Sequence, residues 1–226
     1  MTSVDSPPIL PRMSKHTPNG ERRPLAAPIY HLVQRIVNHG IGSRYLPRRA
    51  AALAWDRLDD LQILEVGCGT GAFPSRGVAT DLDLARVRFV SKQGRVGVAA
   101  DGRSLPFADG SFALVYCEGV LHHIDDQGAI SLVAEMLRVC DPKGHVVVMD
   151  SVWPNSPFRV LAWVLRWADF GRHVRSETAL RSVLRAARGE LKSAMRITYT
   201  TIGLEALLCV LVPGPAREEA LRATSA

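Results

Sequence analysis

Acidic residues and histidines stand at the ends of short apolar runs in this chain, where their side chains could act on a ligand. They are Glu65, Asp81, Asp101, Glu118, His122 and His123. Each run has the length and composition of a buried strand, and the carboxyl ends of parallel strands meet at one edge of a sheet. Ligands of open parallel sheets bind along that edge. Carboxylates there can accept hydrogen bonds from the ligand, and a histidine can accept or donate a proton near neutral pH.

Three glycines form the turn that follows the first of these runs. The run 63–66 leads into Gly67, Gly69 and Gly71. Glycine accepts backbone angles that a Cβ forbids, and it lets a ligand lie against the main chain. The N–H groups of such a turn can hold a carboxylate or a phosphate, while Glu65 can take donors from the same ligand. The turn fits the loose dinucleotide fingerprint, and it also fits a second pattern, in which an acid is followed by three glycines. The turn alone therefore does not decide between two kinds of nucleotide-type ligand.

Three stretches resemble the class I S-adenosylmethionine-dependent methyltransferases, in particular the type 11, UbiE-like group that acts on small molecules. ILEVGCGTG at 63–71 resembles the first motif of that family, SLPFADGSF at 104–112 resembles a second, and VLHHI at 120–124 resembles the end of its fourth strand. The turn at 141–144, preceded by Arg138 and Val139, resembles a further family motif. One departure is Ala113, where the family usually has Asp. The resemblance covers about residues 61–150 and favours this family over the dinucleotide alternative.

The resemblance implies S-adenosyl-L-methionine as the cofactor and assigns roles along the strand ends. Asp81 ends the second strand, where an acid can accept both ribose hydroxyls; the alternative is that it caps a helix over 82–90. Asp101 matches the acid that receives the adenine amino group. The predicted cofactor-binding residues are Glu65, Gly67, Cys68, Gly69, Gly71, Asp81, Leu82, Asp101, Gly102 and Glu118. His123 and His122 are the candidate catalytic bases, with a structural role as the alternative, and no metal site is predicted.

Strands alternating with crossovers predict an α/β fold, with a doubly wound, mostly parallel seven-stranded sheet and an antiparallel closing hairpin. We expect a disordered leader over 1–24, one domain over 25–212 and a flexible tail over 213–226. Within the domain we expect N-terminal helices at 25–60, the cofactor-binding core at 61–152, a helical lid insertion at 153–190 and the hairpin at 194–212. Phe73–Arg76 is too short for a full helical crossover, so the first connection should be reduced to a turn or two.

Composition fits a single soluble-type domain of 226 residues, of which 47% are hydrophobic and 22% charged. The four cysteines show no metal spacing, which predicts buried thiols in a reducing compartment. No segment is long and apolar enough to span a bilayer, and no secretory signal is evident. We therefore expect a cytoplasmic protein, monomeric or homodimeric, with contact between 158–170 and the inner face of the membrane as one alternative.

The predicted reaction is methyl transfer to a small-molecule or lipid-like acceptor. The helical run 158–170 is apolar almost all round, and residues 157–196 carry nine Lys or Arg against three Asp or Glu. A hydrophobic, anionic acceptor methylated on oxygen or carbon would suit that combination, because arginine binds carboxylate and phosphate well. The helix 29–37, with Tyr30 and His31, could instead cover the ligand mouth. The alternatives are a nucleic-acid methyltransferase, a non-catalytic cofactor-binding regulator and an NAD(P)-binding oxidoreductase; nucleic acid is not the expected partner.

Overall fold

A seven-stranded sheet in the order β3-β2-β1-β4-β5-β7-β6 forms the centre of the computed structural model, which describes residues 45–69, 76–156, 159, 162, 172–199 and 203–214. The strands are β1 Ile63–Val66, β2 Val78–Asp81, β3 Gly97–Ala99, β4 Phe112–Glu118, β5 Cys140–Val152, β6 Gly189–Thr198 and β7 Glu205–Pro213. Neighbouring strands from β3 to β5 pair in parallel, whereas β7 is antiparallel to both β5 and β6. The predicted doubly wound sheet with its closing hairpin is confirmed.

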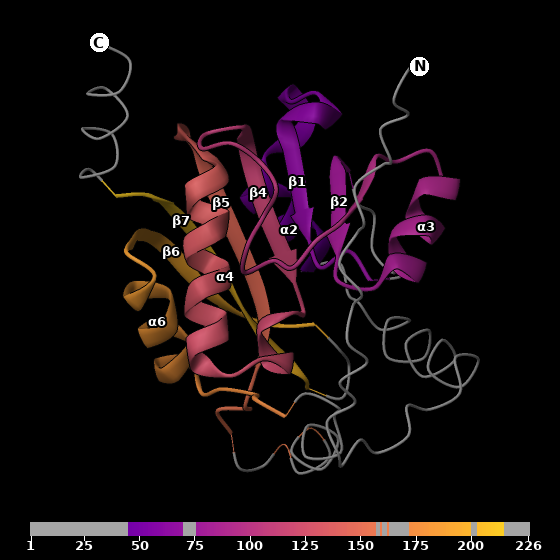
Figure 1. The fold of residues 1–226 in the computed structure, drawn as a ribbon. Helices are drawn as coiled ribbons and strands as arrows, with labels where there is room; N and C mark the ends of the chain where they lie inside the picture. Colours follow the sequence, from indigo (N-terminus) through magenta and orange to yellow (C-terminus); the bar gives the residue numbers. More distant parts are fainter. Residues whose placement is uncertain are drawn as a thin grey trace, which may run out of the picture.

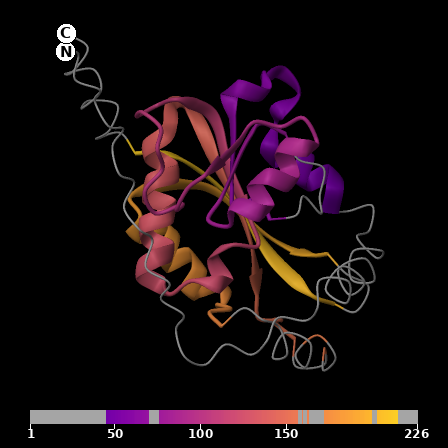
Figure 2. The same ribbon diagram turned by 45° about the vertical axis from the view of Figure 1, so that its right-hand side comes forward.

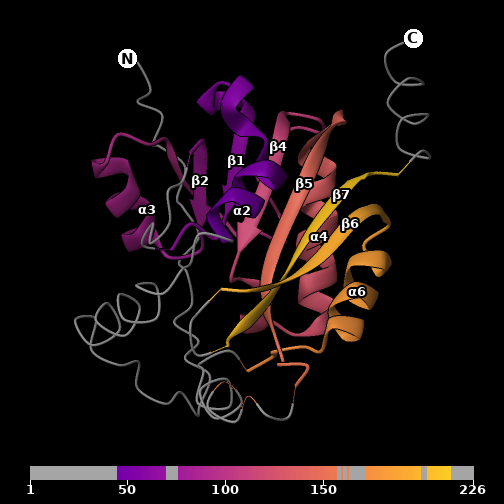
Figure 3. The ribbon, with the colours of Figure 1, turned by 180° about the vertical axis from the view of Figure 1, so that it is seen from behind.

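Helices cover both faces of this sheet. They are α2 Tyr45–Leu53, α3 Leu84–Lys92, α4 Asp126–Val139 and α6 Glu177–Ala186, with short 3-10 helices η1 Trp55–Arg57, η2 Asp60–Gln62 and η3 Leu121–His123. Helices α4 and α6 lie side by side on one face (Figures 1 and 2). Helix α2 lies on the other face, as the view from behind shows (Figure 3). Helix α3 packs on β2 and β3 near the free edge of the sheet.

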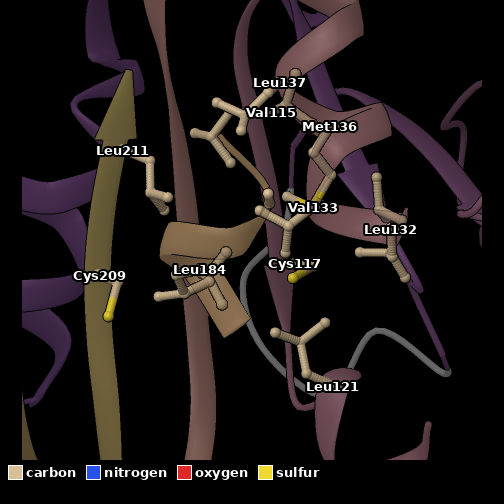
Figure 4. Close-up of a cluster of buried hydrophobic side chains, with 14 of the residues drawn as sticks. Val115, Cys117, Leu121, Leu132, Val133, Met136, Leu137, Leu184, Cys209 and Leu211 are labelled. Atoms are coloured by element: carbon tan, nitrogen blue, oxygen red, sulfur yellow. The ribbon is translucent and has the colours of Figure 1, made fainter. Parts of the chain in front are cut away.

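The larger core lies between the sheet and the α4 and α6 layer. Alternation along the strands divides the apolar side chains: Leu64 and Val66 face this core, while Ile63 faces the smaller core under α2. Figure 4 shows Val133, Met136 and Leu137 of α4 meeting Val115 and Cys117 of β4, with Leu184 of α6 beside Cys209 and Leu211 of β7. Both cores are continuous along the sheet, so β1, β4 and β5 form a rigid platform whose carboxyl ends meet at the lower edge in Figure 1.

The segment expected to form a helical lid, 153–190, includes a helix that is part of the body of the domain. Residues 177–186 form α6, whose Leu180, Val183 and Leu184 belong to the main core, so this part is a layer of the domain. Its amphipathic pattern is the reason, since apolar residues three and four apart make one buried stripe. Strand β6 begins at Gly189, earlier than the predicted hairpin. The apolar run 158–170 and the helix 29–37 fall outside the described residues, except for 159 and 162.

The predicted turn at 141–144 lies inside β5, which begins at Cys140. The pairing is irregular there, because Phe112 lies opposite Cys140 and Leu114 opposite His145. Residues 141–144 therefore bulge against Ala113. A Cβ on Gly144 would lie 2.4 Å from the carbonyl oxygen of Ala113, so only glycine allows the two strands to approach this closely. The turn motif marks a bulge at the start of a strand.

Candidate active site

The glycine turn follows β1 at the carboxyl edge of the sheet, and its backbone is left-handed at two glycines. Gly67 and Gly69 have φ of 77° and 55°. A Cβ on Gly67 would lie 2.5 Å from Cγ2 of Val120, so the bare glycine lets the turn approach the segment that follows β4. The N–H groups of Gly67 and Cys68 donate to Thr80 O, both at 2.8 Å, so these donors bind the protein itself rather than standing ready for a ligand. Gly71 lies outside the described residues.

Asp81 ends β2 directly beside this turn. Its carboxylate is 7% exposed and accepts hydrogen bonds from Gly69 N and Asp83 N, both at 2.9 Å. The N-cap of α3 is Asp83, whose side chain accepts from Ala85 N, so the capping alternative for Asp81 is wrong. Next to this fixed carboxylate, Leu82 is 73% exposed. A buried acid beside an exposed apolar side chain offers a ligand both hydrogen-bond acceptors and a hydrophobic contact.

Glu65, the acid of the first motif, contacts an arginine from beyond α3. Its carboxylate receives Arg95 Nη1 at 2.6 Å, and the two side chains are 7% and 14% exposed. Arg95 also donates to Gly77 O at 3.1 Å and to Arg76 O at 3.0 Å. Tyr116 Oη donates to the same carbonyl of Arg76 at 3.2 Å. The Glu65 and Arg95 pair thus fixes the end of the shortened first connection against β1.

Asp101 and Gly102 follow β3 and lie beside the start of the second motif. Arg103 Nη2 lies 2.7 Å from Asp101, and this hydrogen bond lowers the pKa of the Asp101 carboxyl against a smaller opposing effect of burial. Gly102 packs so closely on Val66 and Leu132 that a Cβ would lie 2.9 Å from each. Asp101 is therefore a carboxylate at neutral pH, held near the end of β1 by the close packing of its neighbour.

Arg138 of α4 shapes the loop that carries the LPF motif. It donates to Leu105 O and Phe107 O, both at 2.9 Å, and pairs with Asp109 at 2.8 Å. Glu135 accepts hydrogen bonds from both Arg138 Nε and Leu105 N. Side chains of one helix thus hold the loop that carries the LPF motif by charge-assisted hydrogen bonds.

Glu118, at the end of β4, forms a bidentate ion pair with Arg49 of α2. Arg49 Nε lies 2.6 Å from Oε1 and Arg49 Nη2 lies 2.9 Å from Oε2 of Glu118. The side chains are 3% and 6% exposed. The carboxylate predicted to bind the cofactor therefore holds the N-terminal helix on the sheet in this structure. Sequence alone did not suggest Arg49, which precedes its partner by 69 positions.

The four cysteines are buried, and none has the environment of a nucleophile. Burial raises the pKa of the Cys68 thiol to about 12, and the nearby Glu65 and Asp81 carboxylates raise it as well. Burial likewise raises the pKa of Cys209 to about 12. These thiols stay protonated at neutral pH, so they serve packing, and Cys68 can offer a cofactor only its main chain and a neutral side chain.

His122 forms a buried pair with Asp150 at the ends of β4 and β5. His122 Nδ1 lies 2.5 Å from Asp150 Oδ1, and the two residues are 8% and 2% exposed. Asp150 also accepts from Ser151 N at 2.6 Å and from His122 N at 3.2 Å. Burial opposes the charge on Asp150, but its interaction with the His122 ring and the hydrogen bonds from the Ser151 and Leu121 N–H groups outweigh burial and lower the pKa of Asp150. An ionised Asp150 fixes the tautomer of His122 with its proton on Nδ1, which places the basic lone pair on Nε2.

His123 is exposed, and its ring lies against that of His122 with centroids 4.0 Å apart and the ring planes tilted by 45°. The two candidate bases differ in burial, since His122 is buried against the carboxylate of Asp150. Asp150 was not among the predicted site residues, although it follows the apolar run 146–149 in the same way that Asp81 follows the run 78–80. Among the described residues, no group of three or more His, Cys, Asp or Glu could hold a metal ion. None of the described helices is long and apolar enough to cross a membrane.

Comparison with known proteins places the chain in a family. A family described as "Methyltransferase domain" matches residues 64–148. The demethylmenaquinone methyltransferase of Deinococcus radiodurans is 31% identical over 173 residues, which cover 69% of this chain and 69% of that protein. The chain belongs to the class I S-adenosylmethionine-dependent methyltransferases. This confirms the predicted family, its enzyme class and its cofactor, and it decides against the NAD(P)-binding alternative.

Other methyltransferases agree with this assignment. The demethylmenaquinone methyltransferase of Renibacterium salmoninarum is 30% identical over 145 residues, and the match spans 60% of each protein. Among solved structures, geranyl diphosphate C-methyltransferase from Streptomyces coelicolor, in complex with S-adenosyl-L-homocysteine, superposes with a TM-score of 0.58. It is 14% identical, and the superposition covers 75% of this chain and 79% of that one. At this identity the likeness confirms the Rossmann-like methyltransferase fold.

Proposed function

We propose that this methyltransferase transfers a methyl group to a ring carbon of a hydrophobic naphthoquinol, the reduced form of a demethylmenaquinone-type acceptor. The acceptor class is supported by the relatives named demethylmenaquinone methyltransferase, at 30% and 31% identity. The chemistry is supported by one feature of this chain, the buried His122 and Asp150 pair at the carboxyl edge of the sheet. A naphthoquinol is hydrophobic and becomes anionic when a hydroxyl is deprotonated, as the predicted acceptor requires.

The residues around the glycine turn fit S-adenosylmethionine. Asp81 would accept the ribose hydroxyls, Asp101 the adenine amino group, and exposed Leu82 would cover the adenine face. Glycine at positions 67 and 69 permits the left-handed backbone of the turn that would carry the ligand. When bound, the cofactor supplies a methyl group already activated by a sulfonium charge. The protein then has to align the acceptor behind the S–CH3 bond and exclude water.

His122 is the general base in this proposal. Asp150 holds the imidazole by Nδ1, so Nε2 accepts the hydroxyl proton of the naphthoquinol. The resulting anion makes the neighbouring ring carbon a nucleophile. That carbon forms a bond to the methyl as the S–CH3 bond breaks, and loss of its hydrogen as a proton restores the aromatic ring. The products are methylated quinol, S-adenosylhomocysteine and one net proton. Ionised Asp150 stabilises the imidazolium that His122 becomes.

Methyl-labelled S-adenosylmethionine tests this proposal with the purified full chain. The label should enter reduced demethylmenaquinone, and not malonyl-acyl carrier protein or geranyl diphosphate, which represent the acceptors of other relatives and neighbours. Label in either of those would overturn the acceptor class. His122→Asn should lower kcat by about 100-fold or more, within the range that general-base catalysis supplies. The matched control is His145→Asn, since His145 lies near the start of β5 and bonds Leu53 O at 3.3 Å.

A further inference from the structure

The 3-10 helix that carries His122 is too short to hold its own shape. Helix η3 has three residues, and its internal hydrogen bonds are His123 N to Val120 O at 3.1 Å and Ile124 N to Leu121 O at 3.3 Å. A single 3-10 turn has poor hydrogen-bond geometry and follows Gly119, which has a φ of 68°. Its position must come from contacts with other elements.

Two buried charges of opposite sign supply those contacts from opposite sides. Asp150 accepts the N–H groups of Leu121 and His122. Arg175 donates Nη1 to Leu121 O at 2.6 Å and Nη2 to Ile124 O at 2.9 Å. The carbonyl of His122 accepts His173 N at 3.0 Å. The anion thus faces the N–H groups of the turn and the cation faces its carbonyls, which matches the direction of the peptide dipoles.

Arg175 is itself fixed by a set of contacts that a different cation could not reproduce. It is 7% exposed, and its Nε donates to Asp126 at the start of α4 at 2.7 Å. Its backbone forms a parallel bridge with Val152, and its carbonyl accepts Trp153 N at 3.1 Å. The planar guanidinium reaches a carboxylate and three carbonyls at once, whereas the single ammonium of lysine cannot. Arg175 belongs to the basic stretch 157–196, and it is a buried structural cation.

We propose that Arg175 is a positioning residue for the base: it holds the carbonyl side of η3 so that the imidazole of His122 keeps its bond to Asp150. This inference rests on the proposed role of His122. Arg175 touches neither the cofactor nor the acceptor in this role. A displacement of η3 by about 1 Å would be enough to lower the rate by about 100-fold, because proton transfer needs close alignment.

Arg175→Lys tests the inference through two readouts. The first is the low-field proton resonance of the His122 Nδ1–H group in the full-length protein, assigned by its loss in His122→Asn. The second is methyl transfer to reduced demethylmenaquinone. Arg175→Lys should broaden or shift the resonance and lower kcat about 10- to 100-fold, with the KM for S-adenosylmethionine changed less than about three-fold. The matched control is Arg185→Lys, an exposed arginine on α6, which should change neither.

The outcomes separate this inference from the function it rests on. If Arg175→Lys leaves both the resonance and kcat unchanged, the positioning role is overturned. If it disturbs the resonance while His122→Asn keeps full activity, Arg175 does position the ring but the ring is not the base. Should Arg175→Lys fail to fold, Asp126→Asn decides, because it removes only the exposed partner of Nε. That variant should shift the resonance slightly and lower kcat about two- to three-fold; no change in either would also overturn the role.

Discussion

Replacing Arg95 tests whether Glu65 serves the fold or binds the cofactor directly. Arg95→Met removes the cation 2.6 Å from Glu65 and the donors to Gly77 O and Arg76 O. Glu65 is 7% exposed, and removing the cation from a buried ion pair costs about 3–5 kcal/mol of unfolding free energy. The double variant Glu65→Met, Arg95→Met removes the charge as well. It should lose only about 1–2 kcal/mol, mostly from the two carbonyls left behind.

Equilibrium urea unfolding of the four proteins, followed by circular dichroism, measures these differences. The double variant should be about 2–3 kcal/mol more stable than Arg95→Met alone, because it no longer leaves a carboxylate buried without its cation. Glu65→Gln should lose about 1–2 kcal/mol because a charge-assisted hydrogen bond becomes a neutral one. A double variant no more stable than Arg95→Met would refute the view that the pair acts as a unit.

Titration calorimetry with S-adenosylmethionine then separates the two roles of Glu65. If Glu65 acts through Arg95, Glu65→Gln should keep the Kd within about three-fold, because the main-chain turn survives. If Glu65 accepts a hydrogen bond from the cofactor, the loss of a charged acceptor should weaken binding about 10- to 100-fold. A loss of that size with unchanged unfolding free energy would refute the structural role.

Two further predictions concern cofactor binding at Asp81 and the pH dependence of stability. Asp81→Ala should weaken S-adenosylmethionine binding about 100-fold or more in calorimetry, because two charged hydrogen bonds to the ribose are lost. The control Asp83→Ala removes only the N-cap of α3, so it should cost about 1 kcal/mol of stability and leave the Kd unchanged. The raised pKa values of Cys68 and Cys209, both about 12, stabilise the fold below pH 9 and lose that contribution as the pH rises from 9 to 12. Unfolding free energy should fall by about 3 kcal/mol between pH 8 and 10 from these two thiols, and Cys209→Ala should remove about half of that fall.

Strands β1, β2 and β4 were predictable because each is a short, mostly apolar run whose side chains are nearly all buried. Such a run has few alternatives, and the acid or glycine after it marks where burial stops. Asp81 illustrates the limit of this signal. Its place at the end of β2 was evident, but that its carboxylate also accepts Gly69 N and Asp83 N depends on how two turns meet. The position of a site residue followed from local pattern, whereas its contacts required the fold.

The arginines show why the rest of the site could not be read in advance. No sequence pattern predicted the burial of Arg49, Arg95 and Arg175, and each is buried or nearly so because a distant carboxylate or carbonyl receives it. The hydrophobic periodicity of a sequence does not show where a long, flexible arginine side chain points. Its partner is also distant in the sequence, by 30 residues for Arg95 and 69 for Arg49. A buried guanidinium without several acceptors would be strongly unfavourable, so each such arginine requires a cluster of acceptors around it. The three clusters lie at Glu65 of β1, at the end of β4 and at the helix that carries His122. These long-range ion pairs could not be predicted from the sequence. They are the contacts that hold the predicted strand ends in the geometry that we propose for methyl transfer.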